Sequence, residues 1–145
     1  MGADDVHTAA ESRLAGRQQR YTSNRRAIVD TLVAAGAPVT MPDMLAARPG
    51  LTQSSTYRNL AMLEEAAVVR RIVSGTEHAH FELAEDLTEH HHHLVCTTCG
   101  AIEDVTLTPA LERTLDRAFA DAAAERGFRT DGHVIDIYGR CGHCQ

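Results

Sequence analysis

Apolar residues in the first half of the chain recur with the spacing of amphipathic helices. One helix is predicted between a candidate N-cap at Thr22 and a stop at Gly36, and its apolar stripe is Ile28, Val29, Leu32 and Val33. After the helix breaker Pro38, Thr40 and Asp43 have the spacing of a capping arrangement, which predicts a second, short helix.

A third helix is predicted from Thr52 or Ser54 to about Ala66, after a turn at residues 48–50. Its inward-facing residues are predicted to be Tyr57, Leu60, Leu63 and Ala67. Two short helices, a turn and a Ser/Thr-rich helix start are typical of a helix-turn-helix. Two extended runs around Ser74-Gly75 then predict a hairpin, which in this position is a wing. We therefore expect a winged helix over residues 1–83, followed by an acidic hinge over residues 84–89.

The second half predicts a small α/β unit over residues 90–145. Strands are expected at residues 93–96, 101–107 and 133–138. Between them, Thr108-Pro109 begins a helix that Gly127 closes. The apolar stripe of this helix is Leu111, Leu115, Ala118, Phe119 and Ala122. So small a unit needs a covalent or metal cross-link, a protein partner, or both to be stable. The predicted fold class is α+β.

Charge divides the 145 residues into unlike halves. Residues 1–73 hold nine Arg and seven acids, whereas residues 74–145 hold five Arg and thirteen acids. Five Arg and no acid lie between Arg13 and Arg26. Such a run fits a solvated helix face as well as it fits DNA, and the helix-turn-helix that follows favours phosphate binding. With no apolar run of about 18–20 residues and no visible secretory signal, we expect a cytoplasmic protein with no membrane partner.

All four cysteines fall in two Cys-x-x-Cys pairs, Cys96 with Cys99 and Cys141 with Cys144. This spacing lets both sulfurs of a pair face one ion, so the pairs together predict a structural Zn2+ site. A redox dithiol and two disulfides are the alternatives. A four-sulfur site would tie the C-terminus onto the small second unit.

Histidines gather around the predicted hinge. Four consecutive histidines occupy residues 90–93, and alternate side chains of a strand face opposite sides. His91 and His93 would therefore serve one site, and His90 and His92 another. His78, His80 and Glu82 share a face of the second wing strand in the same way. This density of donors predicts metal binding.

These features together resemble the ferric uptake regulator (Fur) family of metal-sensing repressors, from about Arg20 to Cys144. The motifs that carry the resemblance are Thr56-Tyr57-Arg58, Phe81-Glu82-Leu83, His90–His93 with Leu94-Val95-Cys96, the two Cys pairs, and His133 before Tyr138-Gly139-Arg140-Cys141. The resemblance implies a winged helix-turn-helix domain plus a small C-terminal α/β dimerisation domain. It also implies a homodimer that binds a palindromic double-stranded DNA operator without an organic cofactor.

The resemblance also implies two donor sets beside the cysteines. The sensor set is Glu82, His91 and His93, sometimes joined by an acid, here Asp104. The second set is His90, His92, Glu112 and His133. Family members often add a sensor ligand from the loop before the second helix, but residues 37–39 here carry none. We infer that His80 or His78 replaces it.

With every cysteine in the structural site, the sensor offers only nitrogen and oxygen donors. Such donors suit Fe2+, Mn2+ or Ni2+, with Zn2+ possible. We rank iron sensing first, manganese or peroxide sensing next, and zinc sensing last. The expected DNA contacts are Tyr57, Arg58, Ser54, Ser55, Arg20 and Arg25. Tyr57 fits the core equally well.

Two other classes of function are weighed against a regulator. His80-Phe81-Glu82 followed by Cys96-x-x-Cys99 has elements of a zinc deaminase signature. Val95 stands where that signature has Pro, and the second Cys pair would have no role. A metal-storage module is a third hypothesis, and it predicts no binding to palindromic DNA. We expect no enzyme.

Overall fold

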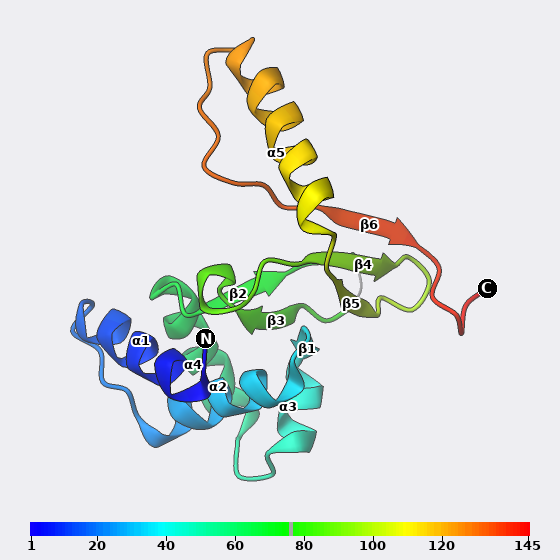
Figure 1. Cartoon of the computed structure of the whole chain (residues 1–145). Helices are drawn as coiled ribbons and strands as arrows, with labels where there is room; N and C mark the ends of the chain where they lie inside the picture. The colour runs from blue at the N-terminus through cyan, green and yellow to red at the C-terminus, as the bar shows by residue number, and fades with distance from the viewer. Residues whose placement is uncertain (76) are drawn as a thin grey trace.

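The computed structural model describes residues 1–75 and 77–145, and it confirms the predicted α+β class. Along the chain the elements are α1 (Ala3–Ala15), α2 (Ser23–Ala35), β1 (Val39–Thr40), α3 (Met41–Ala47), α4 (Gln53–Glu65), β2 (Val69–Ile72), β3 (His80–Leu83), the 3-10 helix η1 (Glu85–Leu87), β4 (His92–Cys96), β5 (Ile102–Val105), α5 (Pro109–Ala124) and β6 (Asp136–Gly139). The strands form two sheets, β1-β3-β2 and β5-β4-β6. Figure 1 shows the helices α1 to α4 gathered on one side of the first sheet.

The helix signals in the first half are confirmed. The Thr22 side chain caps α2 by accepting a hydrogen bond from the backbone N–H of Arg25, and Gly36 ends the helix with φ +59°. Thr40 and Asp43 form the reciprocal capping box that begins α3. These caps fix the ends of the two helices that precede α4.

Helix α4 corrects part of the inward-facing prediction. Leu60 and Leu63 are fully buried, but Tyr57 is 51% exposed. Ala67 lies beyond the helix end with φ +57° and is exposed. Thr56 is the buried residue at this point of the helix, and the Tyr57 ring faces outward.

Helix α1 is an element that the sequence did not predict. Val6, Ala10 and Leu14 are buried at a spacing of four residues and join the core built by α2, α4 and β3. This stripe of one Val, one Ala and one Leu is weak as a sequence signal. Arg13 extends the contact, since its guanidinium donates to the carboxylate of Asp86 and to the backbone carbonyl of Ala67.

The predicted wing is a three-stranded sheet rather than an isolated hairpin. Strands β2 and β3 pair antiparallel, with Arg70 opposite Glu82, and β1 adds to the other edge of β3. The linker that follows is not free, because Leu87 of η1 is only 2% exposed and belongs to the N-terminal core. The N-terminal packing therefore extends four residues beyond the predicted end of the wing.

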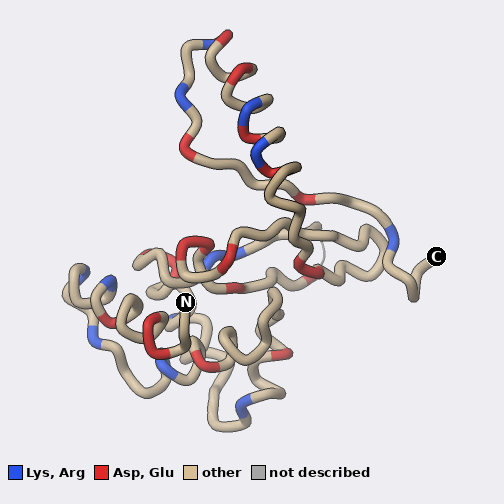
Figure 2. The backbone as a smooth tube through the Cα atoms, in the orientation of Figure 1, with Lys and Arg blue, Asp and Glu red and all other residues tan. Residues whose placement is uncertain are grey.

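The second sheet is built around β4. β5 pairs with β4 antiparallel and β6 pairs with it parallel. Helix α5 begins at the predicted cap, Thr108, and then extends away from the sheet (Figure 1). None of its residues is buried, and Leu111 and Phe119 are 44% and 37% exposed. Figure 2 shows acidic and basic residues interspersed along it. In the described residues, no helix is both long and apolar enough to cross a membrane.

We expect Leu14→Ala to lower the free energy of unfolding by about 2–5 kcal/mol, because it opens a cavity in a fully buried position that joins α1 to the core. Urea unfolding followed by circular dichroism measures this change. Glu11→Ala, at an exposed position of the same helix, is the control and should change stability by less than about 0.5 kcal/mol. Equal stability of both variants would show that α1 does not contribute to the core.

Candidate metal centres

Three groups of metal-ligating side chains converge in the described part of the chain. In each group the ligand atoms all lie within 4.8 Å of one another. The groups are Cys96, Cys99, Cys141 and Cys144; Glu82, His91, His93 and Asp104; and His90, His92, Glu112 and His133.

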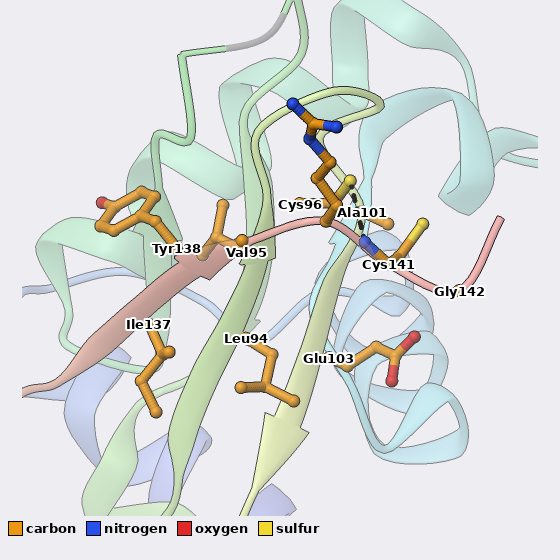
Figure 3. A pocket seen from close by; sticks show the side chains of 11 residues that line it. Leu94, Val95, Cys96, Ala101, Glu103, Ile137, Tyr138, Cys141 and Gly142 are labelled. Atoms are coloured by element: carbon orange, nitrogen blue, oxygen red, sulfur yellow. Dashed lines mark hydrogen bonds between the residues drawn. The ribbon is translucent and has the colours of Figure 1, made fainter. Parts of the chain in front are cut away.

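The four cysteines come together where β4 ends and where the chain leaves β6. Sγ of Cys99 lies 3.8 Å from Sγ of Cys141, which is far longer than a disulfide bond. Figure 3 shows one cysteine of each pair, Cys96 and Cys141, lying side by side, and the backbone N–H of Cys141 donates to Sγ of Cys96 at 3.4 Å. All four are free thiols that face one point, which is the donor set of a closed structural zinc site.

The local electrostatics fit a cation at this point. Backbone N–H groups of Cys141, Cys99 and Thr98 stabilise the thiolate of Cys96 and lower its pKa to about 5. The hydrogen bond to Cys141, with the other thiols close by, raises the pKa of Cys144. Four sulfurs this close become thiolates together only if a positive ion compensates their charge.

The second group lies between the two sheets. Glu82 comes from β3 of the first sheet, whereas His93 comes from β4 and Asp104 from β5 of the second. His91 lies just before β4. Oε2 of Glu82 is 3.1 Å from Nε2 of His91 and 3.2 Å from Nε2 of His93. The carboxylate of Asp104 lies 3.8 Å from the same two nitrogens.

Hydrogen bonds on the far side of each imidazole fix which nitrogen faces the site. Nδ1 of His91 lies 2.8 Å from the backbone carbonyl of Glu89, and Nδ1 of His93 lies 3.0 Å from a carboxylate oxygen of Asp136. Both partners only accept, so each Nδ1 carries a hydrogen. In the neutral rings the lone pairs of Nε2 then point at Glu82 Oε2, which is also an acceptor. A proton or a metal ion is needed between these acceptors.

The pKa shifts follow from this crowding of acceptors. The hydrogen bond with Glu82 raises the pKa of His93 despite the opposing effect of burial. Burial lowers the pKa of His91, but hydrogen bonds with Glu89 and Glu82 outweigh burial and raise it. Burial also opposes ionisation of Glu82, yet its hydrogen bonds and the charge of Arg70 lower the pKa of Glu82 to about 2. A metal ion entering this group would displace protons from the imidazoles.

His80 corrects one sequence expectation, because it lies outside this group. It shares a face of β3 with Glu82, but its backbone pairs with Thr40 and Ile72, away from β4. The charged groups that affect its pKa are Asp43 and His78, and burial, the largest effect, lowers that pKa. Neither His80 nor His78 is among the converging donors of the described chain.

The loop that carries no ligand nevertheless reaches the site. Ala37 lines a cavity of about 420 Å³ together with Glu82, His91 and Asp104. The apolar residues Val6, Leu32 and Val33 of the N-terminal unit line the same cavity. The donor group is therefore open on the side of the N-terminal unit.

The third group lies on the other face of β4. Nε2 of His92 is 2.8 Å from Oε1 of Glu112 on α5, while His90 and His133 each approach Oε2 of Glu112 at 3.4 Å. The odd and even histidines of residues 90–93 thus face different groups. Sequence reasoning missed Glu85 of η1, whose carboxylate is 2.5 Å from Nδ1 of His90.

The residues expected at DNA are partly exposed and partly engaged within the protein. Tyr57, Arg58, Ser54 and Arg20 are exposed. Ser55 Oγ accepts from the side-chain amides of Asn24 and Asn59, at 3.3 and 3.2 Å.

Arg25 is also engaged within the protein. Its guanidinium donates to Asn59, to the carbonyl of Arg20 and to Gln19. Arg25 and Ser55 therefore hold α4 against α2, and the exposed face of α4 carries Tyr57 and Arg58.

We expect Cys96→Ser to lose tightly bound zinc and to disrupt the C-terminal unit, because that unit has little apolar core without the four-sulfur staple. Zinc content measured by plasma mass spectrometry, with size-exclusion chromatography for assembly, checks this. Thr97→Ser, an exposed neighbour in the same turn, is the control. Retention of one zinc per chain with unchanged elution by the Cys96→Ser variant would contradict the four-sulfur assignment.

The chain is similar in sequence to known proteins. The sequence profile of the ferric uptake regulator family matches residues 16–138. The chain is 35% identical over 132 residues to the ferric uptake regulation protein of Campylobacter jejuni, which covers 86% of this chain and 79% of that protein. It is 30% identical over 148 residues to the peroxide operon regulator of Bacillus subtilis, which covers 99% of this chain and 96% of that protein.

Solved structures show the same fold at low sequence identity. The ferric uptake regulator of Helicobacter pylori, described as having three functional metal binding sites, superposes with a TM-score of 0.78 at 18% identity and covers 99% of this chain and 94% of that one. The regulator of Pseudomonas aeruginosa with manganese has a TM-score of 0.70 at 24% identity and covers 90% and 96%. Members of this family are transcription regulators rather than enzymes. The chain belongs to the ferric uptake regulator family.

Proposed function

We propose that this protein is an Fe2+-responsive repressor that binds a palindromic operator as a homodimer, in the cytoplasm where the DNA lies. Its sensor metal would be held by Glu82, His91, His93 and Asp104. The observation that supports this most strongly is that donors from both sheets converge with nitrogen lone pairs facing a carboxylate oxygen. Structural Zn2+ would occupy the four-cysteine group.

The donor chemistry favours iron or manganese over zinc. The sensor group holds two imidazoles and two carboxylates and no thiolate, because all four cysteines lie in the other group. Iron stands first because several relatives, including the C. jejuni protein, are named ferric uptake regulation proteins. Mn2+ is the alternative with the same donors, and Zn2+ comes third.

Metal at this site would couple the DNA-binding unit to the rest of the chain. Glu82 lies on the wing sheet, whereas His91, His93 and Asp104 belong to the second sheet and its approach. An ion held by both sheets stabilises one relative arrangement of the two units, and the resulting gain in DNA affinity equals its differential affinity for that arrangement. Since Leu87 packs into the N-terminal core, we place the pivot at residues 88–90, within and just beyond the predicted hinge.

A second copy of the chain would cover the apolar surface of the C-terminal unit. Helix α5 has no buried residue, although Leu111 and Phe119 lie on its apolar stripe. Leu94 and Ile137, neighbours on β4 and β6, are 40% and 45% exposed on one sheet face (Figure 3). Large apolar side chains grouped at the surface in this way often mark a protein interface. The pseudo-palindrome of an operator then mirrors the two-fold axis of the dimer.

Peroxide sensing is the second candidate, and the match to the peroxide operon regulator over 99% of the chain favours it. The two functions separate in one experiment on anaerobic protein. For a peroxide sensor, hydrogen peroxide should abolish DNA binding by the Fe2+ form and leave DNA binding by the Mn2+ form unchanged. For an iron sensor, the Fe2+ form should stay bound to DNA.

We expect Arg58→Ala to weaken binding to the operator upstream of the protein's own gene, because an exposed guanidinium on α4 neutralises a phosphate. The slope of log K against log salt, from fluorescence anisotropy, should fall in magnitude by about one. Arg113→Ala on α5 removes the same charge far from α4 and should leave the slope unchanged. An unchanged slope for the Arg58→Ala variant would mean that Arg58 does not contact the DNA backbone.

We expect His91→Ala to abolish the metal-dependent increase in DNA affinity while zinc content and fold are retained, since one of four sensor donors is lost. Titrations with Fe2+, Mn2+, Ni2+ and Zn2+ on the same operator measure the response of each variant. The metal-dependent gain in DNA affinity that the variant should lose is about 1–3 kcal/mol, which corresponds to about five- to 150-fold.

His133→Ala is the matched variant for the third group and should reduce the response less, because Glu112 and His92 belong to the C-terminal unit. If His133→Ala abolishes the metal-dependent increase in DNA affinity and His91→Ala does not, the assignments of the sensor and the second site are interchanged.

A further inference from the structure

We propose that Arg70 is a built-in competitor for the sensor metal, a fixed cation that binds Glu82 and sets how much metal is needed to fill the site. This inference rests on the proposed function, since it concerns the affinity of the same site. Arg70 was not among the residues that the sequence indicated, because its position opposite Glu82 depends on the register of the wing strands.

The two oxygens of Glu82 have different partners. Nε of Arg70 donates to Oε1 at 2.9 Å, and Nη2 of Arg70 donates to the same oxygen. Oε2 faces the imidazoles of His91 and His93. Because the carboxylate is 7% exposed and the guanidinium 27%, this pair is shielded from water. With Arg70 in place, Glu82 has one oxygen left for a metal.

The guanidinium also reaches the centre of the donor group. Nη2 of Arg70 lies 3.5 Å from Nε2 of His93, the nitrogen that faces Glu82. Arg70 is charged at every physiological pH and only donates hydrogen bonds, so it cannot become a ligand. A divalent ion that binds Glu82 Oε2 and His93 Nε2 would therefore lie within a few ångströms of a permanent positive charge.

This arrangement has two consequences of opposite sign. Without metal, Arg70 compensates the charge of the buried Glu82 and of Asp104, so the empty site does not repel the wing from the second sheet. With metal, the same charge repels the ion and keeps Glu82 from binding through both oxygens. The binding threshold is thereby raised, which suits a sensor that must stay empty until free metal is abundant.

Arg71 provides a matched control on the same strand. It is the next residue of β2, so its side chain faces the opposite side of the sheet, where it is exposed and lines a different cavity with Tyr57 and Phe81. A change at Arg71 removes the same charge without touching Glu82.

The test is the affinity of zinc-loaded full-length protein for Mn2+, measured by electron paramagnetic resonance of the free ion at fixed pH. Mn2+ is the probe because it avoids the thiolate site. Arg70→Gln keeps a donor for Glu82 and removes the charge, and Arg70→Thr, which suits a strand, is a second uncharged variant. Both should bind Mn2+ about tenfold more tightly than the natural chain, whereas Arg71→Gln should stay within twofold.

Arg70→Lys separates charge from shape. It keeps the charge and loses the planar fork, so its Mn2+ affinity should remain within threefold of the natural chain. Thermal unfolding adds a second readout: Arg70→Gln should lower Tm without Mn2+ and show a larger rise on adding Mn2+. A purely structural role for Arg70 predicts equal loss of Tm with and without the ion.

Unchanged or weaker Mn2+ binding by the Arg70→Gln and Arg70→Thr variants would overturn the inference. If His91→Ala still abolished Mn2+ binding in that case, the proposed sensor would stand and Arg70 alone would be misassigned. In the His133→Ala background, where the third group lacks one of its donors, Mn2+ binding that does not depend on His91 would instead overturn the proposed sensor site, and with it the role of Arg70.

Discussion

The two sheets of this protein meet at the carboxylate of Glu82. Oε2 of Glu82 faces two imidazole nitrogens whose own hydrogens are directed elsewhere, to the carbonyl of Glu89 and to Asp136. The lone pairs of the two imidazole nitrogens therefore face a carboxylate oxygen in a buried space. This arrangement is stable only when a positive charge lies among these acceptors. The guanidinium of Arg70 supplies part of it, and protons on His91 and His93 or a divalent ion supply the rest. Since Glu82 belongs to the wing sheet and the imidazoles to the second sheet, the charge at this point determines how firmly the halves are held together.

Patterns of short range were the part of the fold that the sequence predicted well. The cap of α2 at Thr22, the capping box of α3 and the alternation of residues 90–93 each depend on neighbours within four residues. The α-helix that was missed, α1, buries only a small stripe, and its importance comes from contacts across the fold, such as that of Arg13 with Asp86. Tyr57 was misplaced because helical spacing alone does not distinguish it from Thr56 as the residue that packs inward.

In the candidate sites, too, the sequence predicted the features that depend on close neighbours in the chain and not those that depend on contacts across the fold. Spacing in the chain was enough to group the four cysteines and to separate the odd from the even histidines. It could not exclude His80, because residues two apart on a strand share a face whether or not the neighbouring sheet reaches both. Nor could it indicate Asp136 or Glu85, since their contacts with His93 and His90 depend on the parallel pairing of β4 with β6 and on the course of the linker.

The placement of the third group suggests why four histidines stand in a row. His92 and His90 hold Glu112 at the beginning of α5, and Glu85 of the linker contacts His90, so this group joins the helix to the segment between the two units. His91 and His93 hold the wing from the opposite face of β4. Strand β4 and the two residues before it thus carry the imidazoles that contact the wing on one side and α5 on the other. Because α5 buries none of its own residues and carries the exposed apolar stripe, the orientation of that surface depends on the same strand as the sensor group. The proposed response to metal and the proposed assembly of two chains would therefore depend on the same strand.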